Sequence, residues 1–172
     1  DDPNPVMIFE HKLLYKSKGP VPLVPYRVPI GKAVVRREGR DVSIVAASIM
    51  AIRAAAAAEC LAQEGIDVEV IDLRSLRPID LATIISSVRK TRRLIVVYEG
   101  VKTMVIGADI GALVAEAEVS RTLAAPIVRL GGAAAPIHYT PLLQTATFPT
   151  YIDVVAAAPT SLRGGRNRGL PS

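Results

Sequence analysis

Residues with strong intrinsic chemistry are sparse in this sequence of 172 residues. Cys60 is the single cysteine, and the two histidines, His11 and His138, lie far apart along the chain. One cysteine excludes a disulfide framework and a thiolate zinc site. Two distant histidines make a histidine-rich metal site unexpected. Cys60 lies in an alanine-rich segment, and we interpret it as a small core residue.

Glu99 follows a short apolar segment and is the one carboxylate of the loop over residues 99–103. Its side chain could act as an acid or base or pair with Arg74 or Arg77, or it could form an ion pair that only fixes the loop. Ser48, at the start of a predicted helix, could bind an anion, although a plain N-cap is favoured. Ser48, Arg74 and Glu99 together suggest an alternative function, a free-standing domain that binds a nucleotide or another small anion. The Ser48 loop lacks the glycine spacing of known phosphate-binding loops.

His138, within PIHYTP, could be a general base, but no acid or nucleophile is linked to it by the sequence. A surface or interface role is therefore favoured for His138. Gly107 begins a predicted helix, where a small residue allows close packing on a neighbouring sheet or subunit. His11, beside Glu10 and Lys12, is expected to end a strand. The residues alone thus indicate a domain without a self-contained active site.

The elements that must position these residues alternate regularly between strands and helices. Apolar strands separated by helices indicate a parallel sheet covered on both faces, so we predict an α/β fold of three layers with a mostly parallel, twisted sheet. Loops at the carboxyl ends of such strands carry function. Ser48 and Asp80 are the expected N-caps. Strands are predicted at residues 32–37, 41–47, 68–73, 94–98 and 126–130, and helices at 49–64, 80–90, 107–123 and 152–158.

The two ends of the chain differ from this regular part. Residues 6–10 (VMIFE) are predicted to form a strand, and a proline-rich linker follows over residues 19–29. A strand before a linker suggests the last strand of a truncated domain. We therefore predict three segments: residues 1–30 as the truncated end and linker, 31–158 as the α/β domain, and 159–172 as a basic Gly/Arg tail.

Composition narrows the class of protein further. Half of the residues are hydrophobic, 22% are charged and tryptophan is absent, so the core must consist of aliphatic residues. The net charge of +5 owes much to Arg163, Arg166 and Arg168 in the tail. Such a tail without aromatic residues does not favour a nucleic-acid partner. The apolar runs are too short to span a membrane, and no signal peptide is visible, so a soluble protein of the cytoplasm, or of an organelle matrix in a eukaryote, is expected.

Several segments, taken together and in order, resemble a known family. They are residues 4–15 (NPVMIFEHKLLY), 28–33 (VPIGKA), 36–39 (RREG), 65–80 (GIDVEVIDLRSLRPID) and 125–130 (APIVRL). They are similar to the C-terminal, transketolase-like domain of the beta subunit of the thiamine-diphosphate-dependent decarboxylase component of 2-oxoacid dehydrogenases. Among the enzymes of this family, pyruvate dehydrogenase resembles these segments most, followed by the branched-chain and acetoin enzymes. The match covers about residues 3–158.

The resemblance implies a function in assembly for this part of the chain. The parent enzyme would decarboxylate a 2-oxo acid oxidatively and acylate lipoyl groups, with thiamine diphosphate and magnesium. The catalytic residues of this family precede Asp1, and the diphosphate site belongs to the alpha subunit, so no cofactor is expected on this chain alone. The implied partners are a second beta subunit, the alpha subunit and the acyltransferase core. Candidate interface or loop-fixing residues are Arg74, Leu76, Pro78, Asp80, Glu99, Gly107, His138 and Tyr139.

Three features depart from the pattern that the family shows. The family usually has a Gly-Gly pair where this chain has Met104 and Val105. The usual acidic residue before the Pro-x-Pro-Tyr segment is replaced by alanines, and the segment itself reads Pro136-Ile137-His138-Tyr139 here. The family normally ends near Ala158, so the tail obscures the expected docking site for the acyltransferase.

Overall fold

The computed structural model describes residues 3–162 and contains one five-stranded sheet, in the order β1-β3-β2-β4-β5. Strands β3, β2, β4 and β5 are parallel, and β1 pairs with β3 in the antiparallel direction. The predicted α/β class and mostly parallel sheet are therefore confirmed. The strands are β1 (Val34–Arg37), β2 (Val42–Ala46), β3 (Val68–Asp72), β4 (Leu94–Val101) and β5 (Val128–Gly132).

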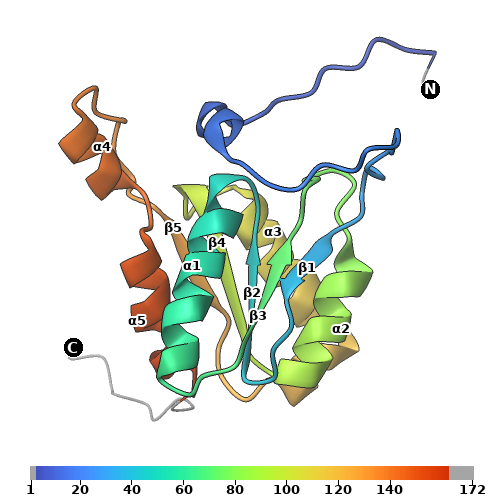
Figure 1. Cartoon of the computed structure of the whole chain (residues 1–172). Coiled ribbons are helices and arrows are strands. Elements are labelled where there is room, and N and C mark those ends of the chain that lie inside the picture. Colours follow the sequence, from blue (N-terminus) through green and yellow to red (C-terminus); the bar gives the residue numbers. More distant parts are fainter. Residues whose placement is uncertain (1–2, 163–172) are drawn as a thin grey trace.

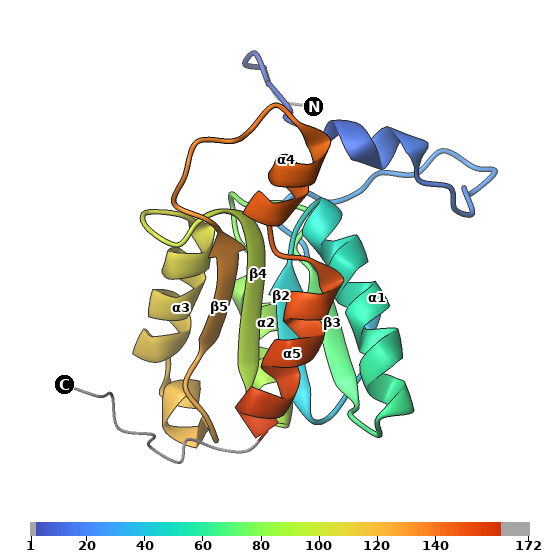
Figure 2. The same cartoon turned by 90° about the vertical axis from the view of Figure 1, so that its left-hand side faces the viewer.

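Helices cover both faces of the sheet (Figures 1 and 2). Helices α1 and α5 pack on one face, and α2 and α3 pack on the other. None of the helices within residues 3–162 is long and apolar enough to cross a membrane. The helices are α1 (Ile49–Gln63), α2 (Leu81–Thr91), α3 (Ile106–Glu116), α4 (Pro141–Thr147) and α5 (Tyr151–Leu162), with 3-10 helices η1 (Lys12–Lys16) and η2 (Glu118–Thr122).

The core consists of aliphatic side chains on both faces of the central strands. Every residue of β2 and β3 is buried. Along β4, Ile95 and Val97 face α1 and α5, while Leu94 and Val96 face α2 and α3. Alternation of this kind follows from the two-residue period of a strand. The alanines of α1 let this helix lie close against the sheet, since Ala54, Ala57 and Ala58 are fully buried.

Asp80 begins α2 as the sequence predicts. Its Oδ1 accepts a hydrogen bond from Thr83 N at 3.2 Å, and its Oδ2 accepts one from Ala33 N at 3.0 Å. Burial raises the pKa of the Asp80 carboxyl, but these hydrogen bonds outweigh burial and hold the pKa below its usual value. Asp80 thus ties the start of α2 to the chain just before β1.

Ser48 does not cap α1 as predicted. Its side chain makes no capping hydrogen bond, and its backbone has φ of 58°. The 3-10 bonds from Met50 N to Ala47 O and from Ala51 N to Ser48 O close the first turn instead. Backbone geometry therefore replaces the side-chain cap at this helix.

Four further sequence predictions need correction. Residues 6–10 form no strand, because no neighbouring strand within residues 3–162 pairs with them. The predicted helix over residues 107–123 is divided, since Ala117 is extended (ψ 151°) between α3 and η2. Residues 141–147, predicted as loop, form α4. The last helix runs to Leu162 rather than Ala158, while Arg163, Arg166 and Arg168 lie outside the described residues.

Residues 3–31, which we call the strap, cross above the carboxyl ends of the parallel strands (Figure 1). Pro20, Pro22, Pro25 and Pro29 keep the second half of the strap extended and remove backbone donors. The strap meets the domain at Gly31, whose φ of +75° favours glycine and whose amide donates to Ser75 Oγ at 3.0 Å.

Candidate functional site

The direction of the crossovers defines a crevice at the carboxyl edge of the sheet. The chain leaves β2 toward α1 on one face and leaves the adjacent β4 toward α3 on the other face. Open α/β sheets bind ligands at such a switch point, because the two loops diverge there. Ser48 follows β2, and Glu99 lies in the last part of β4. The candidate site therefore lies between these two strand ends.

His11 of the strap reaches this crevice and pairs with Glu99. His11 Nδ1 accepts a hydrogen bond from Leu13 N at 3.2 Å, so Nε2 carries the proton and donates to Glu99 Oε1 at 3.1 Å. Both side chains are about three-quarters buried, at 26% and 30% exposed. Glu99 thus fixes the strap rather than pairing with Arg74 or Arg77. His11 caps η1 instead of ending a strand.

The side chain of Arg74 also binds the chain's own backbone. Its backbone is left-handed, with φ of 55°. Arg74 Nε donates to Lys32 O at 3.0 Å, and Nη2 donates to Ala33 O at 3.5 Å. The guanidinium therefore faces two carbonyl oxygens of the short segment between the strap and β1. Arg74 and Glu99 thus bind atoms of the chain itself, which does not favour the anion-binding role of the nucleotide-binding alternative.

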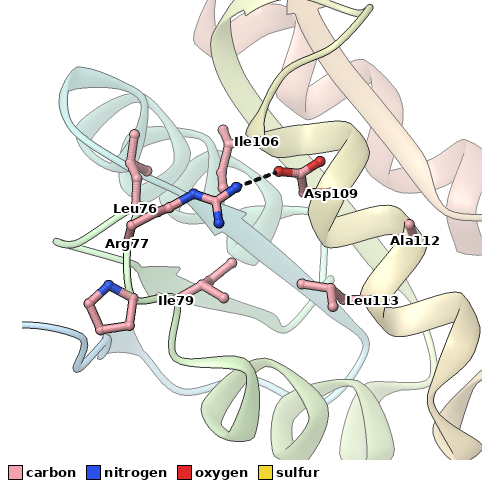
Figure 3. Close-up of a pocket in the computed structure, with 8 residues that line it drawn as sticks. Leu76, Arg77, Ile79, Ile106, Asp109, Ala112 and Leu113 are labelled. Carbon is pink, nitrogen blue, oxygen red and sulfur yellow. Dashed lines mark ion pairs between the residues drawn. The ribbon is translucent and has the colours of Figure 1, made fainter.

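Leu76 and Pro78 flank a groove between the loop after β3 and helix α3 (Figure 3). The groove has a volume of about 360 Å³. Arg77 crosses its mouth, with Nη2 3.6 Å from Asp109 Oδ2. Sequence reasoning named Leu76 and Pro78 only as candidate interface residues. Their joint position opposite α3 could not be read from the sequence, because α3 begins almost thirty residues later.

Gly107 allows helix α3 to lie directly against the ring of Tyr98. A Cβ at Gly107 would lie 1.9 Å from Tyr98 Cε1, and a Cβ at Gly131 would lie 2.6 Å from Tyr98 Cε2. The ring is therefore held between two glycines, one from α3 and one from β5. The sequence suggested that Gly107 allows close packing on a neighbouring sheet. The structure shows such packing, which is possible because Gly107 has no side chain.

His138 and Tyr139 lie in the exposed loop before α4, and Tyr139 is fully exposed. Neither side chain has a hydrogen-bond partner among residues 3–162.

A second hollow of about 490 Å³ lies between Lys102, Gly132 and Phe148. Asp153, on its rim, accepts hydrogen bonds from Thr150 N and Oγ1, which lower the pKa of its carboxyl. Asp153 thus caps α5 and is not a free acid.

Within residues 3–162, no group of three or more histidine, cysteine, aspartate or glutamate side chains could hold a metal ion. The single acid at the crevice, Glu99, is bound to His11. The donor set of the described residues therefore does not fit a magnesium–diphosphate site. The contacts of these residues attach segments of the chain to one another.

One antiparallel edge strand on an otherwise parallel four-strand core, with two helices packed on each face, makes this a doubly wound α/β domain. Residues 31–154 match the family described as "Transketolase, C-terminal domain", and the chain belongs to this family. A split-gene transketolase, solved as an inactive beta4 tetramer, has the same fold at 32% identity, with a TM-score of 0.72 over 82% of this chain and 45% of that chain. A 2-oxoglutarate:ferredoxin oxidoreductase from Magnetococcus marinus, 14% identical with a TM-score of 0.53, shares the fold alone.

The chain is also similar to particular beta subunits. It is 45% identical over 161 residues to the pyruvate dehydrogenase E1 component subunit beta-1 of Arabidopsis thaliana, which covers 91% of this chain and 44% of that protein. It is 40% identical over 166 residues to the beta subunit of the acetoin:2,6-dichlorophenolindophenol oxidoreductase of Cupriavidus necator, which covers 96% of this chain and 49% of that protein. The chain thus spans about half the length of the curated relatives it matches.

Proposed function

We propose that the chain is the C-terminal part of the beta subunit of a 2-oxoacid dehydrogenase decarboxylase component, and that it supports subunit assembly and docking of the acyltransferase core. The parent enzyme would decarboxylate a 2-oxo acid oxidatively and acylate lipoyl groups. Pyruvate is the proposed substrate of the parent enzyme, and acetoin chemistry is the second candidate, since relatives of both kinds match almost the whole chain.

The observation that carries this proposal is the strap across the switch-point crevice. His11 binds Glu99 where a ligand would otherwise enter, so the usual ligand position of this fold holds the chain's own residues. The strap also exposes a run of apolar side chains, Val6, Met7, Ile8 and Phe9, at 60–88%. Contiguous apolar surface of this kind is typical of a face that other protein covers.

A second apolar surface lies at α4. Ile137, Tyr139 and Leu142 are 63–100% exposed, and α4 lies at the same end of the molecule as the strap (Figures 1 and 2). The proposed occupants of the two surfaces are a second beta subunit and the alpha subunit, with the acyltransferase core at the C-terminal end of the chain. The solved relative that forms a beta4 tetramer supports association between chains of this kind.

Thiamine diphosphate and magnesium are proposed for the parent enzyme and not for residues 3–162 alone, since these residues lack a suitable donor set. The proposed location is the cytoplasm, or an organelle matrix in a eukaryote. The domain boundaries proposed are 1–30 for the end of a preceding domain with its linker, 31–158 for the α/β domain and 159–172 for the basic tail.

Sedimentation of the 172-residue chain tests the assembly role. The chain should self-associate with increasing concentration, and Ile8→Ser/Phe9→Ser should weaken association at least tenfold. Ile152→Ser is the control, because Ile152 is also exposed, at 61%, but lies on α5. A strictly monomeric chain at high concentration would contradict the proposal.

Calorimetric titration separates the assembly domain from the nucleotide-binding alternative. The isolated chain should bind neither ATP nor thiamine diphosphate with magnesium. Tight binding of either ligand would overturn the proposal, because an assembly domain has no site for it.

A further inference from the structure

The groove between the loop after β3 and helix α3 has the dimensions of a small-molecule site. Its volume is about 360 Å³, within the usual range for such sites. Ile79, Ile106 and Leu113 point into it from two different elements (Figure 3). The walls are therefore aliphatic, while the charged atoms of Arg77 and Asp109 lie together at the mouth. An apolar pocket with a few polar groups at its mouth favours a ligand with an apolar tail and a polar head.

The charges at the mouth favour an anionic head. Arg77 has five N–H donors, and its ion pair with Asp109, at 3.6 Å, is its one interaction within residues 3–162. Asp109 lies in the first turn of α3, where the positive end of the helix already stabilises its carboxylate. Val105, which precedes the helix, supplies no side-chain cap. Arg77 therefore has free donors that can bind a second carboxylate.

We propose that this groove binds a small aliphatic carboxylate, with the carboxylate on Arg77 and the tail between Ile79, Ile106 and Leu113. The ligand is a free acid of roughly four to six carbons, since the groove belongs to the size class of small-molecule sites. This site differs from the switch-point crevice: it lies between the loop after β3 and helix α3, on the face of the sheet that α2 and α3 cover. It does not depend on the proposed assembly function.

Titration of the 15N-labelled chain with sodium hexanoate tests the proposal. Saturable shifts should be confined to residues 76–79 and 106–113, with a dissociation constant on the order of 1 mM, as expected for a small ligand with few polar contacts. Acetate lacks the tail and hexylamine has the opposite charge, so each should bind at least tenfold more weakly. Absence of saturation, or equal binding of hexylamine, would overturn the proposal.

Paired variants locate the site. Ala112 lines the groove and Ala115 lies on the same helix outside it, and both are exposed. Ala112→Phe should therefore abolish hexanoate binding while Ala115→Phe preserves it. Arg77→Gln should weaken binding at least tenfold, whereas Arg121→Gln, another exposed arginine, should not. Equal loss of binding in the Ala115 variant would contradict the assignment.

Two more measurements fix the chemistry of the ligand. Asp109→Asn should tighten hexanoate binding, because it removes the carboxylate that competes for Arg77. Weaker binding would contradict the proposed role of Arg77.

A hexapeptide that ends in leucine offers the groove the same two groups, a carboxylate and an aliphatic side chain. The peptide is compared in two forms, one with a free and one with an amidated C-terminus. Binding of the free peptide more than tenfold tighter than hexanoate would overturn the assignment to a small acid and indicate a protein C-terminus.

Discussion

His11 Nε2 donates to Glu99 Oε1 at 3.1 Å and joins two residues that are 88 positions apart in the sequence. The same imidazole accepts from Leu13 N through Nδ1, so one side chain both starts η1 and attaches the strap to the sheet. Both nitrogens have defined roles, which fixes the tautomer. The pair is the side-chain link between the strap and the switch-point crevice.

Glu99→Ala, which removes the acceptor of the His11 hydrogen bond, should loosen the strap without unfolding the domain. A partly buried hydrogen bond of this kind contributes about 1 kcal/mol, so the opening equilibrium of the strap should rise about fivefold. Tryptic cleavage after Lys12, Lys16 or Lys18 measures this opening. Glu116→Ala, on the exposed side of α3, is the matched control and should leave the cleavage rate unchanged. Equal cleavage of wild type and the Glu99 variant would show that the pair does not hold the strap.

Gly107→Ala should strongly destabilise the domain, whereas Gly111→Ala in the same helix should not. The Cβ at position 107 would overlap the Tyr98 ring, which Gly131 prevents from moving, so a cost of about 3 kcal/mol or more is expected. At position 111 the Cβ would meet only Arg129 Cδ, at 3.7 Å, and the helix should gain about 0.5–1 kcal/mol. Urea unfolding measures both, and a similar effect at the two positions would contradict the packing described here.

Met104 has a left-handed backbone, with φ of 52°, and its side chain is 94% exposed. The resemblance places a glycine at this position in related chains. Met104→Gly should therefore stabilise the domain by about 0.5 kcal/mol, because relief of backbone strain exceeds the entropy cost of glycine. Met104→Val should destabilise it, since a β-branched side chain tolerates this conformation poorly. Melting temperatures in the reverse order would refute this explanation.

Asp80 should make the stability of the domain depend on pH at the acid end. The hydrogen bonds from Ala33 and Thr83 lower the pKa of its carboxyl in the folded state, so its contribution is present above the unfolded value of about 3.9 and is lost as the pH falls through the lower folded value. Asp80→Ala should cost about 1–2 kcal/mol at pH 7.

Asp80→Asn removes the charge and keeps the cap, since the asparagine oxygen can still accept from Thr83 N, although its NH2 group cannot accept from Ala33 N. Its stability should approach that of wild type as the pH falls below about 4. Chemical denaturation between pH 3 and pH 7 measures the difference. A difference that stays constant over this range would show that the ionised carboxylate contributes nothing.

Local signals in the sequence were sufficient for most elements of the domain. The sequence predicts the cap at Asp80 correctly, because the capping bond from Thr83 N lies within one helical turn. Helix α4 was missed although Pro141 follows Thr140 at its start, a pattern typical of a first helical turn. The break at Ala117 has no glycine or proline to signal it, so a continuous helical period was predicted across it.

The sequence by itself determined the mostly parallel sheet, the order of its helices and the family. The spacing of apolar residues and the short family motifs are local properties of the chain, so they can be read without a structure. Only the tertiary structure decided what the candidate residues do. It placed His11 on Glu99, turned Arg74 toward the carbonyls of residues 32 and 33, and brought Arg77 to Asp109 across an apolar groove. These pairs form between elements far apart in the chain, and their partners depend on the crossovers and on the path of the strap, which no local pattern encodes.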